Sequence, residues 1–317
     1  MRTRFRRGVP PELVVVWALV LFVAAEIFVT YSRLPADDLY HVSGTGPDAA
    51  VGRVLVFLNY PVALIALPII LLALDRVAGL TVRTAGIAGL LLCSVVFWPG
   101  VVDQADLDAK AVNALPALGV AVAVALTIAL ARSRGVDPPI PVFRATGDRL
   151  RIGVTALALV AAVPWMLADL GLSLDGVPVL GSIWQTGELR SQPGVWALHP
   201  AVHHGHHHGM DGVLFVVTAF LLSRRIPAID GARIRNATAA FLSLMLAYGV
   251  AEIANDFWLE QVVKRGWTDW EIPDVTRPSL SVGWGVIVLA AIAIYSLWFG
   301  RSERRPIDSH MPVPETP

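Results

Sequence analysis

The densest group of chemically reactive side chains in this 317-residue chain is a run of histidines between Trp196 and Gly212. Six of the eight histidines fall within ten residues of this segment, and Asp211 follows three residues later. These six are His199, His203, His204, His206, His207 and His208. Neutral imidazole is the commonest metal ligand among the side chains, and a packed core does not require such a run. The segment therefore predicts a metal site.

If the segment is helical, at about 100° per residue, the ligands fall on two faces. One face carries His199, His203 and His206. The other carries His204, His208 and Asp211 in the pattern H-x-x-x-H-x-x-D, with His207 between the two faces. Two faces predict one or two metal ions, or one ion together with residues that orient its ligands.

Three glycines interrupt the run, at positions 205, 209 and 212. Each costs a helix about 1 kcal/mol relative to alanine, so they weaken the helical interpretation. They would also let a metal ion or a substrate approach the backbone. The alternative to a metal site is an exposed histidine-rich loop without defined ligand geometry.

The types of ligand in this segment limit which metal ion could bind. Several imidazoles with a few carboxylates suit iron, copper or zinc rather than magnesium or calcium. We expect iron or copper first, with zinc as the alternative. Such an ion would either activate dioxygen or lower the pKa of a bound water for hydrolysis.

Carboxylates also occur inside apolar segments of the chain. Glu252 and Asp256 share one helical stripe with Tyr248 and Asn255, at i, i+4, i+7 and i+8. Glu26 lies within another apolar run. An acid inside a bilayer costs several kcal/mol unless it is paired, and by default it indicates function. We predict catalytic roles for Glu252 and Asp256, as general base or further ligand. The structural alternative is that they only pair with an arginine or a tyrosine hydroxyl.

The elements that must position these side chains are membrane helices. The chain is 55% hydrophobic and 16% charged, against about 25% charged in soluble domains. The sequence predicts an all-α polytopic bundle as a single domain over residues 1–300, with 301–317 as a disordered cytoplasmic tail. Eight spans are expected, near Leu13–Thr30, Val54–Leu74, Ala85–Val102, Ala111–Ala131, Ile152–Leu172, Met210–Leu222, Ala237–Trp258 and Leu280–Phe299.

Basic residues predict the orientation of these spans. With eight spans, one side collects 18 of the 25 Lys and Arg residues, which is typical of the cytoplasm. Both termini then lie in the cytoplasm of a plasma-membrane protein. The other side collects 17 of the 25 acids and seven of the eight histidines, so the metal site is expected outside the cell. Two long connections there, 173–208 and 259–278, are expected to pack as a cap over the bundle.

The leading functional hypothesis is a membrane metalloenzyme that acts on a lipid or a lipid-linked substrate, by oxidation or by hydrolysis. Clustered histidines on a helical membrane scaffold resemble, in type only, those of the fatty acid hydroxylases and desaturases. Those enzymes spread H-x-x-x-H and H-x-x-H-H boxes over several cytoplasmic segments, whereas this chain has one box on the opposite face. We therefore transfer no residue role from them. The glutamate-containing zinc-peptidase box H-E-x-x-H is absent.

Other functions stay open at this stage. A transition-metal transporter needs a polar path through the bilayer, and intramembrane acids occur only in the outer part of the spans. A metal-handling or assembly factor, or a sensor, would use the metal only to join two outer loops, with closed coordination. Haem binding is less favoured because no other span contains a histidine. Cys93 is the only cysteine, which excludes an intrachain disulfide and a thiolate cluster. Nothing in the sequence indicates a nucleotide or nucleic-acid partner.

Overall fold

The computed structural model describes residues 9–33, 44–98, 110–133, 145, 147–169, 177–178, 189–190, 199–200, 207–263, 265–273, 275 and 278–301. The main helices are α1 (Pro11–Arg33), α3 (Pro47–Phe57), α4 (Ala63–Arg76), α5 (Leu80–Ser94), α6 (Ala114–Arg132), α7 (Asp148–Asp169), α9 (His207–Ser223), α10 (Ala232–Trp258) and α11 (Val282–Leu297). The strands are β1 (Leu189–Arg190) and β2 (His199–Pro200), which form a short antiparallel pair.

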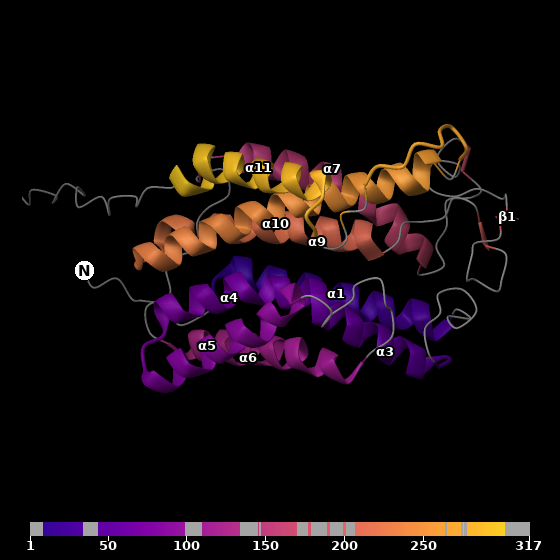
Figure 1. The fold of residues 1–317 in the computed structure, drawn as a ribbon. Coiled ribbons are helices and arrows are strands. Elements are labelled where there is room, and N and C mark those ends of the chain that lie inside the picture. The colour runs from indigo at the N-terminus through magenta and orange to yellow at the C-terminus, as the bar shows by residue number, and fades with distance from the viewer. Residues whose placement is uncertain are drawn as a thin grey trace, which may run out of the picture.

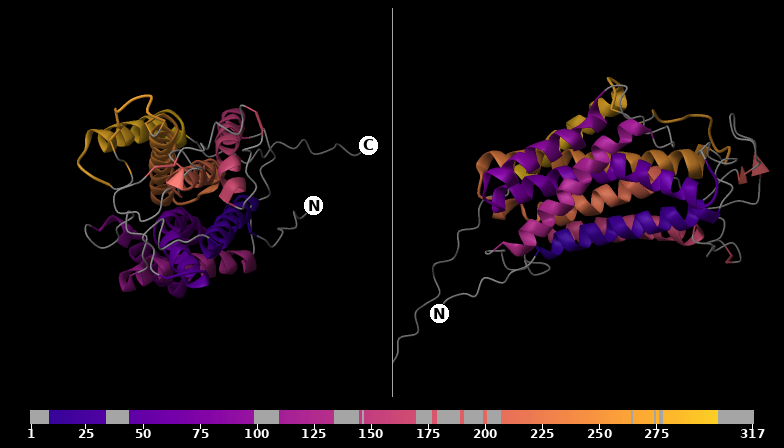
Figure 2. Two further views of the ribbon diagram at one scale, coloured as in Figure 1. Left: turned by 90° about the vertical axis from the view of Figure 1, so that its right-hand side faces the viewer. Right: turned by 90° about the horizontal axis from the view of Figure 1, so that it is seen from below.

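The helices form two layers (Figure 1). One layer contains α1 and α3 to α6, and the other contains α7, α9, α10 and α11; the end-on view in Figure 2 shows the same division. Contacts between α1 and α9 and between α4 and α10 join the layers. A continuous hydrophobic core runs through both layers. The expectation of a helical membrane bundle therefore agrees with the described structure.

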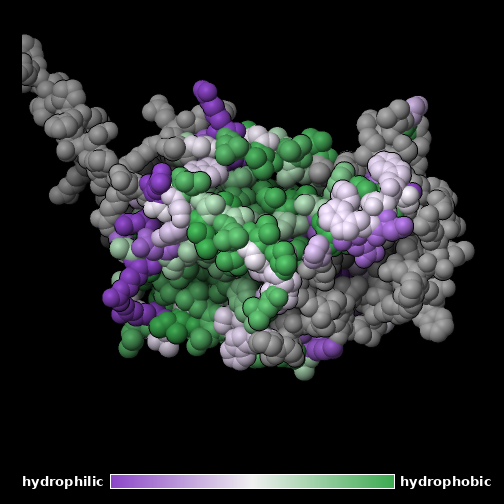
Figure 3. Space-filling model, turned by 45° about the horizontal axis from the view of Figure 1, so that its top comes forward, coloured by the Kyte–Doolittle hydropathy of each residue, from purple (hydrophilic) through white to green (hydrophobic). Residues whose placement is uncertain are grey.

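Among the described residues, six stretches are long and apolar enough to cross a membrane. They are Pro11–Arg33, Pro47–Arg76, Leu80–Phe97, Ala111–Arg132, Ala232–Val263 and Val282–Arg301. Two further helices, α7 and α9, coincide with the fifth and sixth predicted spans and pack in the bundle. The count of eight spans therefore stays a prediction. Figure 3 shows the broad hydrophobic face that such helices present between more polar ends.

The stretch from Pro47 to Arg76 is one continuous helix interrupted by a π-helical turn, η1, at Leu58–Val62. Pro61 lies inside this turn, and proline has no backbone N–H to continue the α-helical pattern. The wider turn absorbs this defect and changes the direction of the side chains around it. The π-helical turn is therefore the form that the interruption at Pro61 takes.

Helix α9 lies at the centre of its layer, between α7 and α10. Every residue from Gly209 to Phe220 is buried. A helix that is apolar on all sides is stable only when other elements surround it. Its 17 residues correspond to about 25 Å of helix, at about 1.5 Å per residue, so it is short for a span.

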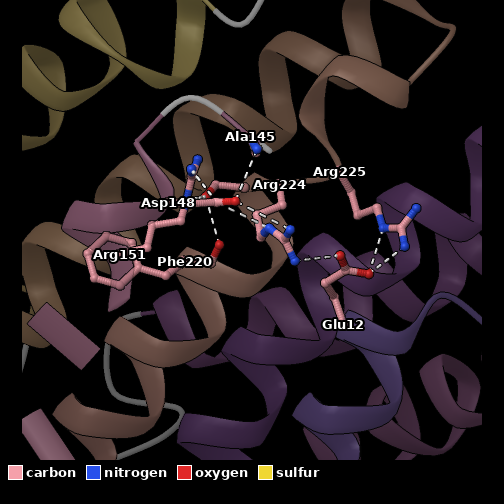
Figure 4. A network of polar contacts seen from close by, with 8 residues as sticks. Glu12, Ala145, Asp148, Arg151, Phe220, Arg224 and Arg225 are labelled. Atoms are coloured by element: carbon pink, nitrogen blue, oxygen red, sulfur yellow. Dashed lines mark hydrogen bonds and ion pairs between the residues drawn. The ribbon is translucent and has the colours of Figure 1, made fainter. Parts of the chain in front are cut away.

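One end of the bundle carries a network of buried ion pairs (Figure 4). We call it the arginine-rich end. Glu12 of α1 accepts hydrogen bonds from Arg225 and, at 3.2 Å, from Arg224, just after α9. Asp148 at the start of α7 pairs with Arg224 and, at 3.3 Å, with Arg151. The network therefore fixes the start of α1, the start of α7 and the end of α9 at the same level.

The Arg151 side chain extends this network toward α9 and Trp298. Its Nε donates to the Ser223 hydroxyl at 3.1 Å, and its guanidinium stacks 4.8 Å from the Trp298 ring centroid. Burial lowers the pKa of Arg151, while the neighbouring Asp148 carboxylate opposes that change. Arginine still remains charged, because its ordinary pKa is far above neutrality.

Asp75, at the end of α4, holds the start of α10 at this same end of the bundle. Its two carboxylate oxygens accept hydrogen bonds from the backbone N–H groups of Asp230 at 2.9 Å and Gly231 at 2.8 Å. Negative charge at a helix N-terminus is favoured by the exposed N–H groups there. Arg76 also donates to the carbonyl of Ala228, so this contact joins the two layers.

Candidate functional site

Away from the arginine-rich end, three helices of the described structure each contribute a buried carboxylate to one region. These carboxylates are Glu26 of α1, Asp211 of α9 and Glu252 of α10, and each is less than 5% exposed. We call these three residues the carboxylate cluster. The charges of Glu26 and of Arg53 in α3 both act on Asp211. The structure therefore brings together acids that are up to 226 positions apart in the sequence.

The neighbours of Glu26 and Asp211 differ. Glu26 Oε1 accepts a hydrogen bond from the Thr30 hydroxyl at 3.0 Å, one turn along α1. Asp211 Oδ1 is buried and has no hydrogen-bond partner among the described residues. A buried polar atom without a partner is costly. Asp211 therefore offers a buried acceptor atom that no described residue uses.

Two tyrosines join the layers beside this cluster. The phenol oxygens of Tyr60 in η1 and Tyr248 in α10 are 2.9 Å apart, at hydrogen-bonding distance. The charge of Glu252 acts on both phenols, and that of Asp211 also acts on Tyr60. The tyrosine pair thus connects the carboxylates to the boundary between the layers.

The π-helical turn adds a buried amide to this region. Asn59 is 1% exposed, and neither its Oδ1 nor its Nδ2 has a hydrogen-bond partner among the described residues. Six positions earlier in the chain, Arg53 is also buried and its guanidinium lies 5.8 Å from the ring centroid of Tyr31. Hence η1 and the turns before it supply a donor, an acceptor and a positive charge to a site whose other members are acids.

Glycines determine how closely α9 and α10 approach at this level. A Cβ atom added to Gly249 would lie 2.7 Å from the carbonyl oxygen of Gly212, and the reverse distance is the same. Small residues let helix backbones come into direct contact inside membranes. Gly212 was expected to allow a metal or a substrate near the backbone, but it is α10 that occupies that space. Because of this contact, the turns that carry Asp211 and Glu252 lie side by side on adjoining helices.

The structure revises the helical interpretation of the histidine run. His199 lies in β2, paired with Arg190 of β1, so it is not part of a helix shared with Asp211. Helix α9 begins at His207, so His207 and His208 precede Asp211 by four and three positions in one helix. These spacings place the three positions on neighbouring turns. His203, His204 and His206 lie outside the described residues.

A complete metal site is not assembled within the part of the chain that the structure describes. No three side chains of His, Cys, Asp or Glu converge there in a geometry that would hold an ion. The three central histidines of the run are not among those residues. The prediction of a transition-metal site with these ligands therefore remains a prediction, with Asp211 as its described carboxylate.

The predicted stripe on α10 is buried as expected, with Tyr248, Glu252, Asn255 and Asp256 each at most 5% exposed. Asn255 belongs to the outer connection rather than to the cluster, since its Nδ2 donates to the carbonyl of Pro273 at 3.3 Å. Trp258 Nε1 likewise donates to the carbonyl of Trp270 at 2.8 Å. The described part of the 259–278 connection thus folds back on the end of α10, as the expectation of a cap requires.

Three residues of this site were not predicted from the sequence: Arg53, Asn59 and Tyr60. A signal was present, because the polar stretch Asn59-Tyr60 directly precedes Pro61 within an apolar run. Polar residues within a span indicate function in the same way as acids do. Their partners come from α9 and α10, which only the packing of the two layers brings near.

Comparison of the chain with protein-family models, with curated proteins and with solved structures gives no match. The function is therefore argued from the site itself.

Proposed function

We propose that this chain is a plasma-membrane metalloenzyme with eight spans and cytoplasmic termini, whose extracytoplasmic metal site acts on a lipid or a lipid-linked substrate. The proposed orientation rests on the arginine-rich end, where Glu12, Asp148 and Arg224 meet. Each of these residues borders a segment that the distribution of basic residues assigns to the cytoplasm. In this topology α7 and α9 cross the membrane in addition to the six apolar stretches.

The observation that carries the proposal is the environment of Asp211. Its Oδ1 is buried without a described partner, and the residue lies in the first turns of the helix that begins at His207. A carboxylate removed from water is stable when it is paired or coordinates a cation. The histidine run leads directly into this helix. Asp211 therefore fits the role of the anionic ligand in a site whose other ligands are imidazoles.

The proposed division of roles follows from positions along α9 and α10. The metal ligands are Asp211 and members of the set His199, His203, His204, His206, His207 and His208. Iron or copper fits these donors first, and zinc is the alternative. The bound ion would supply oxidative chemistry or activate water for hydrolysis. Glu252, beside the Tyr60–Tyr248 pair, would accept or return a proton, and Asp256 lies one turn further along α10.

The proposal is tested by elemental analysis of the full-length protein purified in detergent. The test variant changes His203, His204, His207 and His208 to Ala. A matched control changes His41 and His310, the two histidines outside the run, to Ala. We expect near-stoichiometric iron, copper or zinc in the wild type and in the control, and its loss in the test variant. Equal metal content in all three proteins, or no metal in the wild type, would refute the proposed centre.

A second function, transport of a transition metal or another cation, is favoured by one observation. Asp211 and Thr218 of α9 and Arg225, two residues after its end, recur at seven-residue intervals, and all three are buried. Thr218 Oγ1 has no hydrogen-bond partner among the described residues. Intervals of seven residues keep side chains on one helix face, about 10 Å apart. This stripe joins the carboxylate cluster to the arginine-rich end. Uptake of radioactive zinc or copper into proteoliposomes that contain the protein would favour transport over catalysis.

A further inference from the structure

A pocket opens between the two layers, next to the carboxylate cluster. Its lining is almost entirely apolar, with side chains from α4, α9, α10 and α11 and from the 3-10 turn at Val95–Phe97. Among these are Leu64, Phe97, Phe215, Phe241 and Trp284. Apolar pockets with a few placed polar groups are the usual form of small-molecule sites. The enclosed space is small, about 20 Å³, so it admits a single group such as a carbonyl, and the apolar remainder of a ligand would extend from it toward the surface of the bundle.

The pocket reaches the membrane-facing surface of the protein. Phe97 lines the pocket, is 41% exposed and is the last residue of one of the six apolar stretches. Phe241 also lines the pocket and is partly exposed on α10. Because the medium around these segments is hydrocarbon, a lipid can enter from the side without passing through water.

The polar side of the pocket is formed by the tyrosine pair. Tyr60 and Tyr248 both line it, and their hydroxyls are hydrogen-bonded to each other at 2.9 Å. Glu252 interacts with both phenols and is not part of the pocket lining. A ligand in the pocket therefore lies against the same tyrosines that border the carboxylate cluster.

Trp284 supplies a hydrogen-bond donor that the described structure does not use. The residue is 9% exposed, and its ring lies 5.1 Å from the ring of Tyr248. The indole Nε1 is buried and has no acceptor among the described residues. Tryptophan usually finds a partner for this N–H when it is buried. An oxygen on a bound ligand would satisfy it.

We infer that this pocket binds a membrane lipid that carries a carbonyl oxygen next to an apolar chain. The oxygen accepts from Trp284 Nε1, and the chain lies along Phe241 and Phe97 toward the bilayer. Both ester lipids and membrane quinones have this chemistry. The inference names the substrate class for the metal centre proposed above and in that respect rests on it, whereas lipid binding itself needs no metal.

The test uses the full-length protein in phosphatidylcholine nanodiscs and two photoreactive probes. One probe is a phosphatidylcholine with a diazirine in its acyl chain, and the other is a benzoquinone with a photoreactive isoprenoid chain. Labelled peptides are identified by mass spectrometry. We expect saturable labelling of the segments that contain Phe97 and Phe241 by one of the two probes, and the probe that labels identifies the source of the carbonyl.

Two variants separate the pocket from its surroundings. Trp284→Phe keeps an aromatic ring but removes the N–H, and it should weaken labelling about fivefold, the effect of one lost hydrogen bond. Leu244→Trp fills the pocket and should abolish labelling. The matched control is Trp267→Phe, because Trp267 is exposed and is not part of the pocket lining. Unchanged labelling in both variants, or no saturable labelling of these segments by either probe, would overturn the inference.

Failure of the lipid site can be distinguished from failure of the metal centre. Metal content is measured in the same samples, and the variant lacking His203, His204, His207 and His208 is labelled in parallel. Saturable labelling of that variant would support the lipid site whatever the outcome for the metal. Stoichiometric metal in a wild-type protein that neither probe labels at the pocket would reject the lipid site and leave the metal centre standing.

Discussion

The phenol oxygens of Tyr60 and Tyr248 lie 2.9 Å apart, although 188 positions separate these residues in the sequence. The bond joins a π-helical turn in one layer to the long helix α10 in the other. Both tyrosines line the apolar pocket and both interact with Glu252, so the bond connects the pocket with the carboxylate cluster.

The tyrosine pair should show energetic coupling. Tyr60→Phe and Tyr248→Phe each remove one hydroxyl without changing the ring, and each removes the hydrogen bond between the two phenols. We expect the double variant to be more stable than the sum of the two single effects predicts, with a coupling energy of about 1 kcal/mol. The free energy of unfolding would be measured by SDS titration in mixed micelles. Strict additivity of the two single effects would contradict a bond between the hydroxyls.

The close contact of α9 and α10 should not tolerate a methyl group. In Gly249→Ala the new Cβ would lie 2.7 Å from the Gly212 carbonyl oxygen, so the helices must separate. We expect a loss of about 1–3 kcal/mol in unfolding free energy. Gly153→Ala in α7 is the control, because no atom lies within 4 Å of the added Cβ, and it should be neutral or slightly stabilising. Equal stability of the two variants would show that the glycine contact is unimportant.

Removal of one partner from the buried ion pair at the arginine-rich end should be costly. Glu12→Ala leaves Arg225 buried at 3% exposure without its main acceptor, and we expect a loss of about 3–5 kcal/mol. The double change Glu12→Leu with Arg225→Met removes both charges and should be less destabilised than Glu12→Ala alone. Thermal unfolding in detergent would compare the variants. A double variant less stable than the single one would contradict this account.

Asp75 should stabilise the junction between α4 and α10. Asp75→Ala removes the acceptors for the N–H groups of Asp230 and Gly231, and we expect a loss of about 1–3 kcal/mol. Asp230→Ala is the matched control. The Asp230 side chain forms an ion pair with Arg76 at 3.6 Å, but it is 73% exposed. Exposed ion pairs contribute little, so its removal should change the unfolding free energy by less than about 0.5 kcal/mol. Comparable losses in both variants would mean that the surface ion pair, not the backbone contact, matters.

Glu252→Gln distinguishes a proton-transfer role from a ligand role. The amide keeps the size of the side chain but cannot act as a base, and the residue is 1% exposed beside Tyr248. We expect turnover of the lipid substrate to fall at least tenfold while metal content stays near the wild-type value, since general base catalysis contributes about 10²–10⁴-fold. An equal fall in activity and in bound metal would make Glu252 a ligand. Asp256→Asn, one turn away, is the comparison variant.

Hydrophobic runs and isolated polar residues in the sequence are sufficient to predict the helices of this protein and the polar face of one of them. The apolar segments predicted a helical membrane bundle, and each of the eight predicted spans overlaps a described helix. The stripe of Tyr248, Glu252 and Asp256 on α10 was also predicted, because a 3.6-residue period is a local property of the sequence. The run of imidazoles predicts metal ligands on the same local basis, and that stays a prediction.

The partners of these residues were decided only by the tertiary structure. That Glu26, Asp211 and Glu252 form one cluster depends on α1, α9 and α10 meeting at one level, which the Gly212–Gly249 contact and the Glu12–Arg225 pair determine together. The pairing of Tyr60 with Tyr248 depends on the π-helical turn around Pro61. Local patterns fix which face of a helix is polar, but packing between distant segments fixes what that face meets. His199 illustrates the difference, because its strand pairing removes it from the helical face that its spacing alone suggested.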